Sequence, residues 1–280
     1  MRLATSAAVL ILMLMSSACS GAPADKKVPA GRPSVVLLHG LARSAHSMHR
    51  MESALHGAGY RVCNIAYPSR EQPIAVLASQ YVAPSIARCV PDADEPVNFV
   101  THSLGGIIVR ELAKAGLVRT FGRVVMLGPP NHGSEVVDAL GDWYIFGAIN
   151  GPAGGELGTS INSVPQRLGP AGFETGVIAG SRSINWINSL IIPGVDDGKV
   201  SVQSAKLEGM RDFLVVATSH PFLMTDGDVI KQTIRFLSHG CFARDEPVGR
   251  FGDGKTPVNS AQPKPTSDKM PIRCLNNIER

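Results

Sequence analysis

The sequence predicts an α/β fold, in which a mostly parallel sheet is covered by helices on both faces. Short continuous apolar runs alternate with segments of helical periodicity, which is the pattern of successive βαβ units. The composition is that of a globular protein, with 44% hydrophobic and 18% charged residues among 280. Such a chain has enough apolar surface to bury a core on both faces of a sheet.

Six apolar runs are predicted as strands and four periodic segments as helices. The strands are expected at residues 34–38, 60–66, 97–100, 123–127, 176–179 and 213–217. The helices are expected at residues 46–58, 73–89, 104–115 and 228–237. Gly59 and Gly116 follow the first and third helices as stop signals. Pro84 is expected to kink the second.

The N-terminus is predicted to be a targeting segment. Residues 1–24 combine a positive start, an apolar stretch and small residues, as a secretory signal peptide does. Two processing sites compete: residues 22–24 form an A-x-A cleavage site, whereas residues 16–19 are similar to a bacterial lipobox that would leave Cys19 lipidated. Ser16 departs from the leucine usual in a lipobox. Either route predicts export, to the cell envelope or as a secreted protein.

The rest of the chain is expected to form one domain and a tail. The α/β domain is predicted over residues 33–240, after a short linker. Residues 131–175 break the alternation, are rich in glycine and carry an apolar cluster at 143–146. We expect this insertion to lie over the sheet as a lid. Residues 241–280 are polar and rich in Pro and Gly, and they are expected to form an extended tail.

The five cysteines agree with export. Removal or lipidation of Cys19 leaves Cys63, Cys89, Cys241 and Cys274, which allow three pairings. Proximity in the sequence favours Cys63–Cys89 and Cys241–Cys274, and free buried thiols are the alternative. No His or Cys cluster has the spacing of metal ligands, so neither a metal nor another cofactor is expected.

Nucleic acid is excluded as a partner. The net charge is only +4, aromatic residues make up 5% of the chain, and no run is rich in Lys or Arg. A nucleic-acid surface would need a basic stripe with interleaved aromatic residues.

The sharpest functional signal is the hexapeptide at residues 101–106, Thr-His-Ser-Leu-Gly-Gly. It lies between a predicted strand and a predicted helix, which is where a nucleophile elbow lifts a serine above the sheet. Ser103 is therefore a candidate nucleophile, and Gly105 allows strand and helix to approach closely. Thr101 replaces the first glycine of the pattern, so an ordinary serine N-cap remains the alternative.

A second signal follows the first predicted strand. His39 and Gly40 end that strand, and Leu41 comes next. A serine hydrolase needs two backbone N–H groups aimed at the developing oxyanion. Those of Leu41 and Leu104 are the candidates, and Gly40 would let the loop turn freely. A simple strand-ending turn is the alternative.

An acid and a base follow later strands. Asp197 or Asp196 lies in the loop after the fifth predicted strand, and His220 lies just past the sixth. With Ser103 they form the order Ser, Asp, His at the carboxyl edge of a parallel sheet. His220 is the candidate general base and acid, and Asp197, with Asp196 as alternative, would orient it. The other histidines are expected to lie on the surface, in loops or at a helix end, and the side chain of His102 to point away from the nucleophile.

At these positions the chain resembles the α/β-hydrolase superfamily, in particular the small bacterial secreted lipases and esterases. The matching pieces are Leu38-His39-Gly40-Leu41, His102-Ser103-Leu104-Gly105-Gly106, Asp197-Gly198-Lys199-Val200 and Ser219-His220. The resemblance spans residues 33–237. The elbow with Thr101 is similar to the Ala-His-Ser-x-Gly form of some small lipases. The resemblance implies an α/β-hydrolase fold and cleavage of carboxylic esters, often of lipids, through an acyl-enzyme without a cofactor.

The expected substrate is a small-molecule ester or a lipid. Export and an apolar insertion favour lipid-like esters, and a lipidated Cys19 or the lid would give peripheral membrane association. Amidase, thioesterase and acyltransferase activities on the same triad remain alternatives, as does a non-catalytic lipid-binding protein on a hydrolase fold. The sequence does not predict a protein partner.

Overall fold

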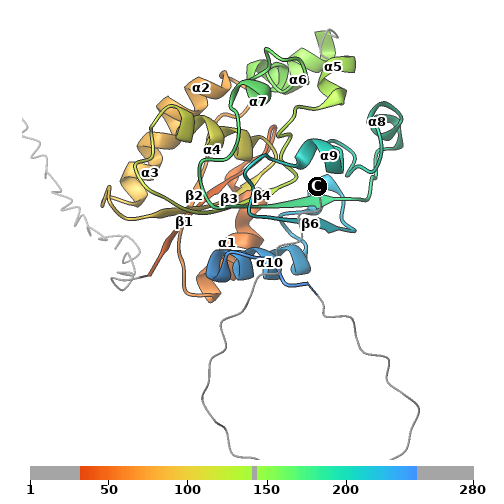
Figure 1. The fold of residues 1–280 in the computed structure, drawn as a ribbon. Helices are drawn as coiled ribbons and strands as arrows, with labels where there is room; N and C mark the ends of the chain where they lie inside the picture. The colour runs from red at the N-terminus through yellow and green to blue at the C-terminus, as the bar shows by residue number, and fades with distance from the viewer. Residues whose placement is uncertain (1–31, 141–143, 245–280) are drawn as a thin grey trace, which may run out of the picture. The chain divides into compact units, whose positions relative to one another are not determined.

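The fold is built on one six-stranded sheet in which every pair of neighbouring strands is parallel. The structure is a computed structural model, and it describes residues 32–140 and 144–244. The strand order is β2-β1-β3-β4-β5-β6 (Figure 1). The strands are β1 (Ser34–Leu38), β2 (Arg61–Ile65), β3 (Val97–His102), β4 (Phe121–Leu127), β5 (Thr175–Gly180) and β6 (Asp212–Val216). All six predicted strands are confirmed, with ends that differ by a few residues.

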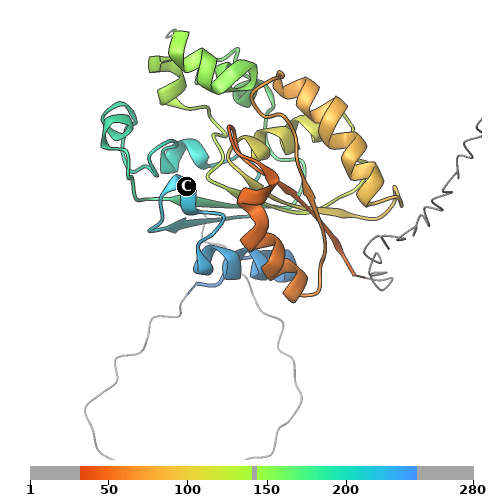
Figure 2. The ribbon, with the colours of Figure 1, turned by 180° about the vertical axis from the view of Figure 1, so that it is seen from behind.

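Helices cover both faces of the sheet, as the sequence predicts (Figures 1 and 2). On one face lie α1 (His49–Gly57), preceded by the 3-10 turn η1 (Ala45–Met48), and α10 (Gly227–His239). On the other lie α2 (Ile74–Val76), η2 (Leu77–Val82), α3 (Ala83–Cys89) and α4 (Leu104–Lys114). Loops carry the short helices α5 (Glu135–Leu140), α6 (Tyr144–Gly155), α7 (Val164–Arg167), α8 (Trp186–Ile191), α9 (Val202–Ala205) and η3 (His220–Phe222).

The core forms two layers because the central strands bury both faces. Successive strand side chains point to opposite faces. Val35 and Leu37 pack in the layer under α1 and α10, whereas Val36 and Leu38 pack in the layer under α4. Every residue of β1 is buried. A continuous apolar run is therefore the correct sequence signal for this strand.

The expected helix at residues 73–89 is continuous but changes its winding. Its middle part, η2, is π-helical, and Pro84 stands in the first turn of α3 directly behind it. Proline lacks an N–H and its ring collides with the carbonyl group four residues earlier. A π-helical turn changes the hydrogen-bond spacing at this point, so the proline alters the helix without ending it.

The segment 131–175 contains more regular structure than its glycine content suggests. It forms α5, α6 and α7, and Gly151 interrupts α6 with a φ of 64°. The sequence analysis also missed α8 and α9. Asn185 and Ser201 cap these two helices, each accepting a hydrogen bond from a backbone N–H in the first turn. Such caps stabilise helices too short to show a clear apolar period.

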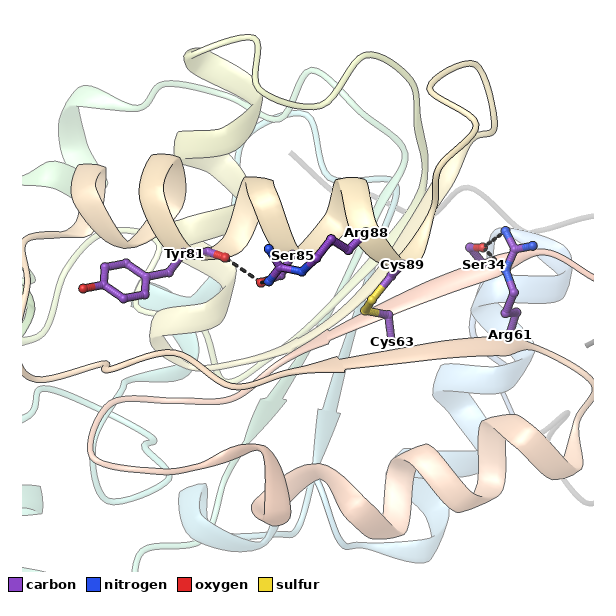
Figure 3. The surroundings of a disulfide bond; sticks show 7 residues. All are labelled: Ser34, Arg61, Cys63, Tyr81, Ser85, Arg88 and Cys89. Atoms are coloured by element: carbon purple, nitrogen blue, oxygen red, sulfur yellow. Dashed lines mark hydrogen bonds between the residues drawn. A yellow bond between two sulfur atoms is a disulfide. The ribbon is translucent and has the colours of Figure 1, made fainter. Parts of the chain in front are cut away.

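A disulfide joins Cys63 in β2 to Cys89 at the end of α3, with their Cα atoms 6.0 Å apart (Figure 3). This confirms the first predicted pair. The bridge fixes the end of a helix to an edge strand of the sheet. Beside it Arg61 donates to Ser34 on the neighbouring strand. The second predicted pair, Cys241–Cys274, lies partly outside the described residues and stays a prediction, as does the fate of Cys19.

Residues 1–24, most of the 241–280 tail and Trp143 also lie outside the described part of the chain. The predicted domain limits and the signal peptide therefore remain predictions. Within residues 32–140 and 144–244, no helix is long and apolar enough to cross a membrane.

Candidate active site

Ser103 lies at the sharp turn between β3 and α4. Its φ of 52° and ψ of −118° give its backbone a positive φ, which residues other than glycine rarely adopt. The Ser103 N–H donates to the carbonyl oxygen of Leu127 at 2.9 Å, at the end of the adjacent strand β4. The neighbouring strand thus holds the strained turn, and such strain concentrates at functional sites.

Close packing around the turn explains the glycine after it. A Cβ atom at Gly105 would lie 2.6 Å from the carbonyl oxygen of Leu38, at the end of β1. Helix α4 therefore starts almost against the sheet, and only glycine fits there. Thr101, which replaces the first glycine of the usual elbow, is fully buried in β3 and is accommodated without breaking the strand.

The candidate base and the candidate acid form a buried pair. His220 Nδ1 lies 2.7 Å from Asp197 Oδ2, and both side chains are almost completely buried. A carboxylate only accepts hydrogen bonds, so Nδ1 carries the proton and donates it. The imidazole Nε2 atom is then the nitrogen that can take a proton from elsewhere.

The two candidate carboxylates have different partners. Asp197 Oδ1 accepts from the backbone N–H groups of Lys199 at 3.0 Å and Val200 at 2.9 Å, which hold the carboxylate in place. Asp196 Oδ1 instead accepts from the N–H of Gly198 at 2.7 Å and from the Ser189 hydroxyl at 2.9 Å. The structure thus brings Asp197, not Asp196, to His220.

Ser103 and His220 line the same pocket, a cavity of about 410 Å³ at the carboxyl edge of the sheet. Within the described ranges no hydrogen bond joins their side chains. Such bonds are often long in enzymes without substrate and tighten in the complex. Part of the pocket wall comes from the segment 131–175, through Ser134, Val136, Val137, Asn150 and Leu157. The insertion therefore lies beside the candidate nucleophile.

The loop after β1 turns tightly next to the elbow. The Arg43 N–H donates to the carbonyl of Gly40 at 3.2 Å, and the Ala42 N–H donates to the buried Ser69 hydroxyl at 3.1 Å. Ala42 has a φ of 54°. A Cβ atom at Gly40 would lie 2.6 Å from His102 Nδ1 and 3.3 Å from Ser103 Cβ. The loop therefore needs glycine at its closest approach to the serine.

Two backbone N–H groups remain available here. Leu104 is the first residue of α4, so its N–H has no partner inside the helix. The N–H of Leu41 makes no backbone or side-chain hydrogen bond with any described residue. Leu41 and Ser103 both line the pocket. These are the donors that the sequence analysis assigned to an oxyanion.

His102 is a site residue whose contribution the sequence analysis missed. Its Nε2 atom lies 3.0 Å from the carbonyl oxygen of His220, and the two rings lie 4.8 Å apart at their centroids. A carbonyl only accepts, so Nε2 is the protonated nitrogen. Burial, and secondly the positive charge that His220 would carry, hold the pKa of His102 well below its usual value. His102 is thus neutral, and it positions the segment that carries His220.

Two cationic side chains, Arg43 and Lys199, also line the pocket. Neither forms a salt bridge with a carboxylate of the described residues. Burial, and then repulsion from Arg43, lower the pKa of Lys199, against the attraction of Asp197. Two cations therefore line the pocket together with the carboxylate of Asp197.

The remaining expectations concern metals and other histidines. In the described part of the chain, no group of three His, Cys, Asp or Glu side chains is placed to hold a metal ion. His46, His49 and His56 are exposed, as predicted, and His239 stands in the last turn of α10. His132 is exposed and lies outside the pocket wall.

The parallel sheet, the elbow after β3, and the Asp and His that follow later strands define the α/β-hydrolase fold. Solved structures with the same fold include the mature lipase BlEst2 of Bacillus licheniformis, at 17% identity and a TM-score of 0.60 over 76% of this chain and 94% of that one. The phospholipase PlaB of Legionella pneumophila matches at 17% identity and a TM-score of 0.56, over 74% and 60%. Lipase B of Aspergillus fumigatus matches at 16% identity and a TM-score of 0.56, over 76% and 55%.

These three similarities establish the fold. No protein-family model matches the sequence, and no curated protein does so.

Proposed function

We propose that the protein is a serine hydrolase that cleaves carboxylic esters through a Ser103–His220–Asp197 triad. The observation that carries the proposal is the buried His220–Asp197 pair beside a serine held at a positive φ. A neutral imidazole oriented by a carboxylate is the general base that a serine nucleophile needs.

The reaction follows from the placement of these groups. Ser103 Oγ attacks the ester carbonyl carbon while His220 Nε2 takes the hydroxyl proton. The tetrahedral intermediate then breaks its bond to the alcohol, which leaves with the proton from His220. Water attacks the acyl-enzyme, again giving a proton to His220. The acid departs as Ser103 recovers that proton, so no proton or electron is gained or lost.

The N–H groups of Leu41 and Leu104 are the proposed oxyanion donors. Negative charge develops on the carbonyl oxygen only during the reaction, so donors fixed beforehand stabilise the transition state more than the substrate. Ser69 supports this role, because its hydroxyl holds the Ala42 N–H and with it the turn that presents Leu41.

A lipid-like ester is the proposed substrate class. Leu41, Pro130, Val136 and Leu157 line the pocket and give it an apolar wall that suits an acyl chain. The lipase and phospholipase names among the structures with this fold point the same way. The segment 131–175, which forms part of this wall, is proposed to act as the lid.

Export is part of the proposal. The disulfide Cys63–Cys89 supports an oxidising compartment. The mature protein would then start after residue 24 or at a lipidated Cys19, and its intact mass distinguishes the two. An unprocessed N-terminus on protein recovered from the producing cells would contradict export.

Labelling with a fluorophosphonate probe tests the reaction, because the probe reacts only with an activated serine. The mature protein is scored by intact mass beside Ser103→Ala and His220→Ala. We expect one adduct on the unaltered protein and none on either variant. Labelling of Ser103→Ala would disprove the nucleophile. A failure to label any form, with or without lipid present, would favour a non-catalytic binding protein.

A further inference from the structure

The segment between β5 and Asp197 exposes an unusual amount of apolar surface. No charged residue occurs between Arg182 and Asp196. In the described part of the chain, nine large apolar side chains are exposed, and five of them lie in this segment. We call these five the α8 patch: Ile184, Trp186, Ile187, Leu190 and Val195.

The helix itself turns its apolar face outward. Trp186, Ile187 and Leu190 are spaced so that they share one face of α8. Trp186 is 72% exposed and Leu190 77%, and α8 has no buried residue at all. In both ribbon views α8 lies at the periphery, away from the helices that cover the sheet (Figures 1 and 2). A helix of this kind does not contribute to the core, and such surfaces mark interaction sites.

The α8 patch is continuous with the mouth of the pocket. Ile184 belongs to both, and Asn185 and Asn188 of the same segment also line the pocket. Phe222, only two residues after His220, is exposed as well. Whatever covers this surface therefore lies against the opening through which a substrate reaches Ser103.

We infer that the α8 patch docks the protein on an anionic lipid surface, with the pocket opening onto the lipid. The tryptophan and the branched aliphatic side chains of the α8 patch suit the boundary between headgroups and acyl chains. Arg43 and Lys199, which line the pocket without a salt bridge to any carboxylate of the described residues, suit acidic headgroups. This inference rests on the proposed function only where it concerns hydrolysis of the bound lipid. Docking itself requires no catalytic activity.

Vesicle binding tests the docking. All forms carry Cys19→Ser, so that no acyl chain on the protein contributes. They also carry Ser103→Ala, so that no lipid is consumed. Sedimentation with vesicles of phosphatidylcholine and phosphatidylglycerol compares this protein with one that also carries Trp186→Ser and Leu190→Ser. We expect binding to weaken by about tenfold or more, because both side chains lose their burial in the lipid.

The matched control is Leu117→Ser, an exposed leucine in the loop after α4 that does not line the pocket. We expect its binding to equal that of the parent protein. Unchanged binding after the α8 substitutions would overturn the inference, as would a parent protein that does not bind vesicles. A dimer that the α8 substitutions dissociate would overturn it in favour of a second copy of this chain.

Two further comparisons complete the test. Vesicles of phosphatidylcholine alone should bind several-fold less, and equal binding would overturn the contribution of charge. With Ser103 restored, the α8 substitutions should slow hydrolysis of vesicle lipid and leave hydrolysis of a soluble short-chain ester unchanged. Loss of both activities would place α8 in the catalytic machinery and contradict a docking role. Vesicle binding without hydrolysis of any ester would refute the proposed function alone.

Discussion

His220 is attached to Asp197 twice. Its Nδ1 atom lies 2.7 Å from Asp197 Oδ2, and its backbone N–H donates to the Asp197 carbonyl oxygen at 2.9 Å. The side-chain bond orients the imidazole, and the backbone bond fixes the loop that carries it. With the contact from His102 to the His220 carbonyl, His220 is held by both neighbours before any substrate binds.

The two neighbouring aspartates should behave differently when changed to asparagine. Asp197→Asn should lower kcat by about three to four orders of magnitude, because an amide can leave His220 in the wrong tautomer. Asp196→Asn should retain most activity, since an amide oxygen can still accept from Gly198 and Ser189. Steady-state ester hydrolysis measures both, and a larger loss in Asp196→Asn would refute the assignment.

Gly40→Ala should impair catalysis more than folding. The added methyl group would meet His102 and crowd Ser103, so the loop must move by a fraction of an ångström or more. We expect kcat to fall by about 10² while KM changes little, because donor position matters most in the transition state. Gly57→Ala is the control, since nothing lies near a Cβ atom there. Equal kinetics for both variants would contradict the role of the loop.

Stability should fall in mild acid because buried histidines must take up protons. The pKa of His102 and that of His39 lie below their usual value in the folded protein, chiefly because of burial. The unfolded chain therefore binds more protons below pH ~6.5. The contribution of these two neutral histidines to the free energy of unfolding is fully present above that pH. It is lost as the pH falls toward their pKa values in the folded protein. Each histidine contributes at most about 1.4 kcal/mol per pH unit.

His102→Gln should flatten this dependence. A glutamine amide can still donate to the His220 carbonyl but does not titrate. The other groups that act on the pH dependence near this position, His39, Arg43, Lys199 and His220, are unchanged. Urea unfolding at pH 5.5 and 7.5, values chosen to lie about one unit either side of the reference pKa, gives the difference. An identical slope in both proteins would show that His102 is already charged in the folded state.

Replacing both Cys63 and Cys89 by serine should lower stability by about 3 kcal/mol, through the freedom regained by the unfolded chain. For a domain of this size that corresponds to a melting temperature about 10 °C lower. Neither cysteine lines the pocket, so hydrolysis at room temperature should persist. Loss of activity in a variant that is still folded would mean that the bridge also shapes the site.

Much of the site could be predicted because it depends on local sequence. Ser103 directly follows β3 and His220 lies four residues after β6, and parallel strands bring their carboxyl ends to one edge. The choice between Asp196 and Asp197 could not be made in this way. Both precede the same glycine, and only the hydrogen bonds within the turn decide which carboxylate reaches His220.

Other features escaped because they depend on tertiary contacts. His102 looks like an ordinary strand residue until the His220 loop, 118 residues later, lies against it. The helices of the segment 131–175 were missed because α5 and α7 are only six and four residues long, and α6 contains four glycines and Pro152. The α8 patch left a trace in the sequence, a long run without charge, but such a run is equally typical of a buried segment.

The position of β6 at the edge of the sheet has a consequence for inactivation. β6 has a partner on one side only, and its residues are less buried than those of β5. The loop after it carries His220, whereas the central strands support Ser103. Detachment of β6 alone would displace the loop with His220 and abolish activity, while the turn at Ser103 stays folded. Activity should therefore disappear on warming before the circular-dichroism signal of the helices changes, and should return when the strand pairs again on cooling.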